Sequence, residues 1–172
     1  MDSRLNSLKQ SLESAVQGMS SEQWACQFPG KWCAAEVLEH LYLTYTGTIK
    51  GFGRVMAAGK PLGSRPSVRD RVKTMLVVGF GHMPDGVKAP AVTVPIGLPA
   101  EKVREEFGAK IVEMDAIIAQ CESRFGRHVK VLDHLILGPL TAPQWRKLHV
   151  VHGRHHHQQL LQPREGAKKQ MR

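Results

Sequence analysis

The chain has 172 residues, a mass of 19.1 kDa and a formal charge of +9. Its hydrophobic fraction of 42% and charged fraction of 23% exclude wholesale disorder, and the length suits one domain. Three cysteines are too few for a disulfide framework, and no apolar run reaches the ~18–20 residues that span a bilayer. Because the N-terminal segment is polar and lacks an apolar signal core, we expect a cytoplasmic protein without a membrane partner.

The positive charge invites a nucleic-acid interpretation, which the motifs do not favour. Part of it lies in the C-terminal segment 163–172, which is basic, has no apolar face and is expected to be a flexible tail. A second basic stretch runs from Arg65 to Lys73. Proteins that bind single strands alternate basic residues with stacking aromatic rings, but only 6% of this chain is aromatic. We therefore expect a solvated basic surface and no specific nucleic-acid partner.

The first half of the chain predicts two amphipathic helices separated by a loop. Apolar residues recur at three- and four-residue steps over residues 3–17. A polar turn and a loop follow. A long helix is then expected from about Cys33 to Ala58, with Glu36 in the position of a capping-box acid. Glycine and proline at positions 59–63 end this helix.

The second half predicts two more long helices. A shorter helix over 67–80 precedes a Gly- and Pro-rich crossover, in which positions 92, 94 and 96 give only a weak strand signal. Helices are expected over 99–123 and over about 142–161, joined by an irregular connection. The pattern predicts a single all-α domain at 1–162, a four-helix bundle with a long crossover and a short extra helix.

Histidines crowd the last predicted helix. His152 and His156 are only ~40° apart around a helix, so their imidazoles can share one metal ion. His40, in the second long helix, is the natural third ligand, and three protein ligands leave room for a substrate, as in catalytic sites. His149, Trp145 and Gln159 lie near the same stripe. The alternatives are a surface histidine patch and, for His40, a hydrogen-bonded core residue.

Two motifs resemble those of the DinB/YfiT-like superfamily. The segment GKWCAAEVLEHL at 30–41 resembles its first histidine motif, and HGRHHHQQL at 152–160, preceded by Gly138-Pro139-Leu140-Thr141 and Trp145, resembles its C-terminal HxxHHxxQ motif. The resemblance covers roughly residues 3–162. Cys33 departs from the pattern, because serine or threonine is usual at this helix cap.

The resemblance implies a four-helix bundle, usually dimeric, that binds a divalent metal through three histidines. By motif match these ligands are His40, His152 and His156. Some relatives are transferases or isomerases that act with low-molecular-weight thiols on small molecules. The expected protein is therefore a homodimer that holds zinc, nickel or iron and acts on a small-molecule substrate.

The expected chemistry is transfer of a thiol to a small electrophile, because a metal-coordinated thiol is deprotonated at neutral pH. The first alternative is a metal-dependent hydrolase with Glu36 as the base, although Glu36 is also the predicted helix cap. The second is a non-catalytic metal-binding stress-response protein. Gln159 and Thr44 are candidates to hold the free ring nitrogens of the ligands. Trp145 is expected to pack at one end of the site.

Overall fold

The computed structural model describes residues 1–27, 29–84 and 86–170, with side chains as far as residue 162. The described part is mostly helical, as predicted, and also contains a small two-stranded sheet that the all-α prediction omitted. None of its helices is long and apolar enough to cross a membrane. The α-helices are α1 (Ser3–Val16), α2 (Ser21–Ala25), α3 (Ala34–Ala58), α4 (Val68–Thr74), α5 (Ala100–Phe125) and α6 (Ala142–Gln170).

The ends of α1 and α3 follow from their capping residues. The Asp2 carboxylate accepts from the backbone N–H groups of Arg4 and Leu5 at the start of α1. At the start of α3, the Glu36 carboxylate accepts from Cys33 N–H at 2.8 Å, as the capping-box prediction requires. Gly59 closes α3 in the left-handed region, with φ of 64°.

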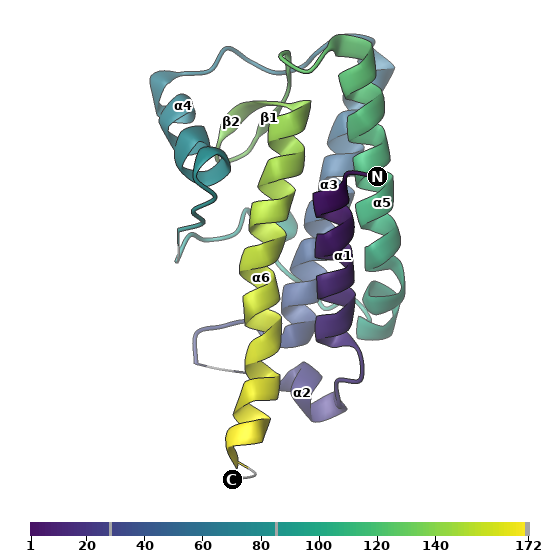
Figure 1. Cartoon of the computed structure of the whole chain (residues 1–172), viewed down its shortest axis with the longest axis vertical. Helices are drawn as coiled ribbons and strands as arrows, with labels where there is room; N and C mark the ends of the chain where they lie inside the picture. Colours follow the sequence, from purple (N-terminus) through teal and green to yellow (C-terminus); the bar gives the residue numbers. More distant parts are fainter. Residues whose placement is uncertain (28, 85, 171–172) are drawn as a thin grey trace.

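Four long helices lie side by side, with α1 and α6 in contact and α3 packed against both α5 and α6 (Figure 1). The colours of Figure 1 show that α3 and α5 run in the same direction. Two neighbouring helices with this relation need a long connection between them. Residues 59–99 supply it, and they include α4, the π-helical turn η1 (Met75–Gly79) and the 3₁₀ turn η2 (Ala91–Thr93). The weak strand signal at 92–96 was therefore wrong.

Two connections that the sequence prediction left irregular contain regular secondary structure. The connection before α6 contains the antiparallel strands β1 (Lys130–His134) and β2 (Gly138–Thr141). The hairpin packs closely on α3, because a Cβ on Gly51 would lie 2.7 Å from Leu132 Cδ2. The sequence prediction also placed a turn and a loop where α2 forms. Ser20 and Gln23 make a capping box that starts this short helix.

The last helix continues beyond its predicted end. We expected it to stop at Leu161, before Pro163, but the α6 backbone is helical to Gln170. Proline removes one helical hydrogen bond and can bend a helix without ending it. The segment 163–172 was expected to be a flexible tail, and of it residues 171–172 lie outside the described residues.

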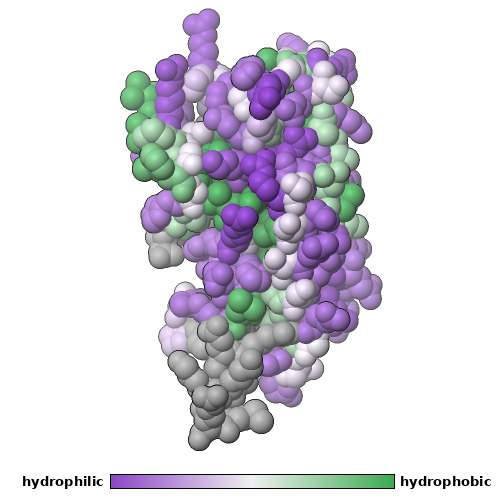
Figure 2. All heavy atoms as spheres, in the orientation of Figure 1, coloured by the Kyte–Doolittle hydropathy of each residue, from purple (hydrophilic) through white to green (hydrophobic). Residues whose placement is uncertain are grey.

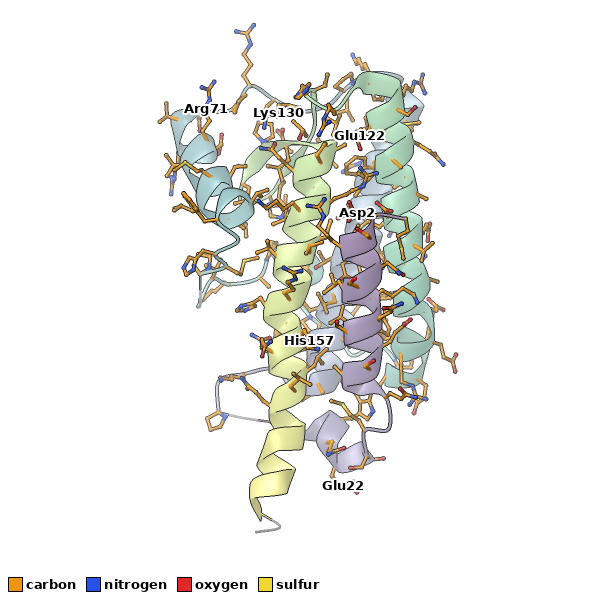
Figure 3. All side chains as sticks on the ribbon, in the orientation of Figure 1. Asp2, Glu22, Arg71, Glu122, Lys130 and His157 are labelled. Atoms are coloured by element: carbon orange, nitrogen blue, oxygen red, sulfur yellow. The ribbon has the colours of Figure 1, made fainter. Side chains whose placement is uncertain are left out.

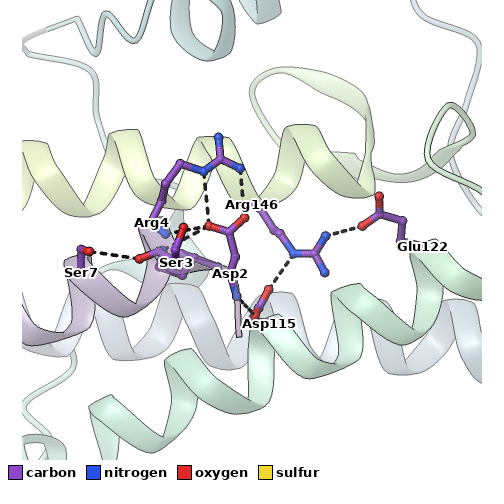
Figure 4. Close-up of polar contacts among 8 residues, drawn as sticks. Asp2, Ser3, Arg4, Ser7, Asp115, Glu122 and Arg146 are labelled. Carbon is purple, nitrogen blue, oxygen red and sulfur yellow. Dashed lines mark hydrogen bonds and ion pairs between the residues drawn. The ribbon is translucent and has the colours of Figure 1, made fainter.

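A buried ion cluster ties α6 to α5 and to the start of the chain (Figure 4). The Asp115 carboxylate, 3% exposed, accepts from Arg146 Nε at 2.6 Å and from Asp2 N–H at 2.7 Å. Arg146 also pairs with Glu122 on α5. Although burial opposes its charge, the hydrogen bonds that Arg146 donates to Asp115 and Glu122 raise the pKa of Arg146. Both the register of α6 and the position of the N-terminus therefore depend on Asp115.

We predict that Asp115→Asn lowers the free energy of unfolding by about 2–3 kcal/mol, because it removes one charge from a buried pair and leaves its partner in place. Urea denaturation at pH 7 measures this change. Glu105→Gln, an exposed acid on α5, is the matched control and should change stability by less than about 0.5 kcal/mol. Equal effects of the two substitutions would contradict a structural role of the cluster.

Candidate metal centre

The three predicted ligands come together between α3 and α6. His40 Nε2 lies 3.1 Å from His152 Nε2, and His156 Nε2 lies 3.0 Å from the same atom. All three ligand atoms fall within 4.8 Å of one another. His40 and His156 are buried, whereas His152 is half-buried. The sequence spacing therefore identified the residues that share this position.

The crossover holds His40 from the side away from the cluster. His40 Nδ1 lies 2.7 Å from the carbonyl oxygen of Thr93 in η2, so this nitrogen must carry the proton and donate it. The preceding residue, Glu39, is also buried and accepts from the N–H groups of Ile96 at 2.7 Å and Gly97 at 3.2 Å. Two consecutive residues of α3 thus fix the crossover and the tautomer of His40.

Gln159 fixes the tautomer of His156, as the Thr93 carbonyl fixes that of His40. Its Oε1 lies 2.8 Å from His156 Nδ1, and its amide nitrogen donates to His155 Nε2 at 3.2 Å. This arrangement makes His156 Nδ1 the protonated nitrogen and leaves its Nε2 with a free lone pair. Gln159, one of the predicted supporting residues, therefore contacts a ring nitrogen of a predicted ligand.

The donor set fits a metal cation. The Nε2 lone pairs of His40 and His156 both face the Nε2 of His152, which carries at most one proton to share between them. Burial lowers the pKa of His40 and lowers that of His156 to about 3, so both rings are neutral at pH 7. Burial and the neighbouring imidazoles hold the pKa of His152 well below its usual range. Nitrogens bound to one tetrahedral zinc ion lie roughly 3.3 Å apart, close to the two short separations observed.

A surface pocket lies next to the cluster, with Trp32 between them. The Trp32 ring is 4.9 Å from the His40 ring, measured between centroids. The same tryptophan lines a pocket that also includes Gln27, Lys31 and Glu36. Glu36 thus borders the pocket, but its carboxylate already accepts from Cys33 N–H. This open surface pocket shares Trp32 with the surroundings of the triad.

Three other predicted residues lie near the cluster without contacting its nitrogens. The Thr44 hydroxyl donates to the backbone carbonyl of His40 at 2.8 Å, so it does not hold the ring as expected. His149 is buried and its Nε2 lies 3.1 Å from Thr48 Oγ1. Trp145 stacks on His149 at 5.8 Å and donates to the carbonyl of Leu132 at 3.2 Å. The rings of His149 and Trp145 are therefore buried in the core, nearer to the N-terminus of α6 than the cluster is.

Sequence reasoning missed Thr93 and the role of Glu39. Thr93 contributes a backbone carbonyl, and the partners of Glu39 are backbone N–H groups, so neither contact depends on a residue type that a motif could reveal. Glu39 offered one weak signal, an acid directly beside a predicted ligand in the sequence.

Comparison with known proteins gives one result for the whole chain. The model of the family described as "Protein of unknown function (DUF1569)" matches residues 2–164. The chain belongs to this family. The matched range contains all three histidines of the cluster and every described side chain except that of Met1. Neither the curated proteins nor the solved structures gave a match.

The half-buried imidazole of His134 in this DUF1569 protein makes acid a test of the fold. His134 Nδ1 accepts from the N–H groups of Ile136 and Leu137 at 3.2 Å each, and burial lowers the pKa of His134 to about 4. A pKa below the unfolded value of ~6.5 means that folding favours the neutral ring. Its contribution to stability is therefore complete above pH 6.5 and is lost as the pH falls towards 4.

We predict that His134→Asn, which keeps an acceptor but cannot titrate in this range, reduces the acid sensitivity of the fold. Between pH 6 and 4, the free energy of unfolding should fall less steeply than in the wild type, by roughly 1.4 kcal/mol per pH unit. Urea denaturation at each pH in the presence of EDTA measures the slope. His128→Asn, in the exposed turn before β1, should retain the wild-type slope. An unchanged slope in His134→Asn would show that His134 is not the titrating group.

Proposed function

We propose that this protein binds a divalent metal ion, such as zinc, nickel or iron, through His40, His152 and His156, and transfers a low-molecular-weight thiol to a small electrophile. The observation that carries the proposal is the convergence of three neutral imidazole nitrogens, two of them oriented by hydrogen bonds from their far side. The proposal includes a DinB/YfiT-like four-helix bundle that forms a cytoplasmic homodimer.

The acids near the cluster favour thiol transfer over hydrolysis. A divalent ion in this position supplies the positive charge that keeps a coordinated thiol deprotonated at neutral pH. Hydrolysis also requires a carboxylate that can take a proton from water. Glu36 accepts from Cys33 N–H and Glu39 accepts from Ile96 and Gly97 N–H, so both carboxylates are already engaged in holding the backbone. Among the described residues, the potential metal-binding group contains histidines alone.

The chain's own residues would position the reactants. Trp32 separates the triad from the pocket that Gln27, Lys31 and Glu36 border, and its ring offers an apolar wall to the electrophile. During transfer, a C–S bond forms, the leaving group departs with its bonding electron pair, and the thiol proton passes to solvent. Thr93 and Gln159 keep the ligand rings in one orientation throughout.

The first test of this proposal is metal binding by the triad. His40→Ala, His152→Ala and His156→Ala should each weaken zinc binding by at least about 100-fold, because loss of even a supporting partner costs about 10–100-fold. Titration of untagged, EDTA-treated protein with a competing chromophoric chelator measures the affinity. His157→Ala, next to a proposed ligand but ~100° away around α6, should bind as the wild type does.

A matched pair of glutamine variants tests the supporting role of Gln159 in the same titration. Gln159→Ala should weaken zinc binding by about tenfold, since His156 Nδ1 loses its acceptor. Gln158→Ala, an exposed neighbour, should leave the affinity unchanged. Wild-type affinity in all three histidine-to-alanine variants of the triad would contradict the proposed site.

The second test is the reaction itself. Zinc-, nickel- and iron(II)-loaded protein is incubated with cysteine, glutathione or coenzyme A and with 1-chloro-2,4-dinitrobenzene, and thioether formation is followed by absorbance. We expect at least one combination to exceed the protein-free rate tenfold, and His40→Ala to abolish the excess. Rates at the protein-free level in every combination would contradict thiol transfer. Metal-dependent cleavage of 4-nitrophenyl esters would then favour the hydrolase, and its absence a non-catalytic metal-binding protein.

A further inference from the structure

A second pocket lies at the opposite end of the long helices from the triad. It has a volume of about 530 Å³ and is bordered by α4, η1, the hairpin and the first turns of α6, with Arg4 and Arg127 at its edge. Figure 3 labels Arg71 on α4 and Lys130 on β1, which both lie at this end of the molecule. None of the triad histidines is among the described residues that line it, and Lys147, the lining residue nearest to them on α6, precedes His152 by five residues, about 7.5 Å along the helix axis. The pocket is therefore separate from the proposed metal centre.

The pocket concentrates unpaired positive charge. Five cations and a single carboxylate, Asp70, line it, and the cations are Arg4, Arg71, Arg127, Lys130 and Lys147. Asp70 is engaged with Ser67, whose hydroxyl donates to it at 2.6 Å. Arg4 pairs with Asp2. Within the described part of the chain, the other four cations have no carboxylate partner within salt-bridge distance.

The partly buried lysine adds to this positive character. Lys130 Nζ donates to Gln144 Oε1 at 2.7 Å, and burial, with Arg71 nearby, lowers the pKa of Lys130. The first turn of α6 contains no acidic residue. The Gln144 N–H at this end of α6 donates to Thr141 Oγ1 at 3.3 Å, so the side chains of the cations, rather than free backbone donors, supply the positive charge of the pocket. These cations repel one another unless an anion lies between them.

The remaining lining sets the size and class of that anion. Apolar side chains of Pro66, Met75 and Val78 contribute to the wall, and none of the residues that line the pocket is aromatic. A nucleobase therefore has no ring on which to stack. An open pocket lined by several cations instead suits a compact ligand of high charge density, since arginine and lysine both bind phosphate oxygens strongly.

We propose that this pocket binds a compact ligand with two or more phosphate groups close together, held by Arg71, Arg127, Lys130 and Lys147. Such a group occurs in a free polyphosphorylated metabolite and in a phosphorylated lipid headgroup. A lipid source is consistent with the exposed apolar side chains of Val68 and Val72 on α4 and Leu76 in η1 beside the pocket, where Figure 2 shows hydrophobic surface. The proposal does not depend on a metal at the triad.

Isothermal titration of the full-length protein with inorganic pyrophosphate, in 150 mM NaCl, tests the proposal. We expect saturable binding, and at least a tenfold increase in Kd for the double variant Arg71→Gln/Arg127→Gln. Both arginines are exposed and have no structural partner among the described residues, so the variant should fold normally. His152→Ala should bind pyrophosphate as the wild type does, which distinguishes this pocket from the triad.

Lys102→Gln/Arg104→Gln is the matched control, because it removes two exposed cations from α5 and changes the net charge equally. Its Kd should rise less than twofold. Equal weakening in both double variants, or no saturable binding up to 1 mM pyrophosphate, would overturn the proposal. Flotation with phosphatidylcholine vesicles that contain phosphatidylinositol bisphosphate then identifies the source. Flotation lost in Arg71→Gln/Arg127→Gln assigns a lipid headgroup, and pyrophosphate binding without flotation assigns a free metabolite.

Discussion

The candidate site depends on how closely α6 packs between two other helices. His40 and His152 are 112 positions apart in the chain, yet their Nε2 atoms lie 3.1 Å apart because α3 and α6 are in contact. On the other side of α6, a Cβ at Gly153 would lie 2.5 Å from Leu8 Cδ2 on α1. Glycine at this position lets α1 press α6 towards α3, so a residue without a side chain helps to set the distance between the ligands.

The crossover completes this arrangement from outside the helices. Glu39 and His40 hold η2 and the residues after it through backbone groups, so the segment that joins α3 to α5 also fixes a ligand ring. The cost of burying the Glu39 charge is offset by two N–H donors. Movement of this loop would remove the carbonyl that accepts the hydrogen bond from His40 Nδ1, and the His40 ring could then rotate. The contacts that stabilise the crossover therefore also orient the ring of His40.

Sequence patterns predicted what local spacing encodes and missed what tertiary contact decides. The i, i+4 pair His152 and His156, and the helix start at Cys33, follow from helical periodicity and capping. The close approach of Gly51 to Leu132, by contrast, joins two residues far apart in the chain and depends on how the hairpin packs on α3. The hairpin escaped prediction because its strands are short and one contains Pro139. Thr93 could not be predicted at all, since any residue supplies the same carbonyl.

The two proposed sites require opposite charges on one helix, and the residues between them explain how both can coexist. His149 lies on α6 between Lys147 of the basic pocket and His152 of the triad, and burial lowers the pKa of His149 to about 3. This part of the core is therefore neutral at pH 7. Lys147, the pocket cation that lies nearest to the triad along α6, precedes His152 by five residues, about 7.5 Å along the helix axis, so solvent screens only part of its repulsion of a metal ion. The cations favour an anion in the pocket, while His152 and His156 lie near mid-helix, where the helix dipole contributes little. A neutral segment of a little over one turn, which contains His149, thus separates the proposed anion site at one end of α6 from the proposed cation site at its middle.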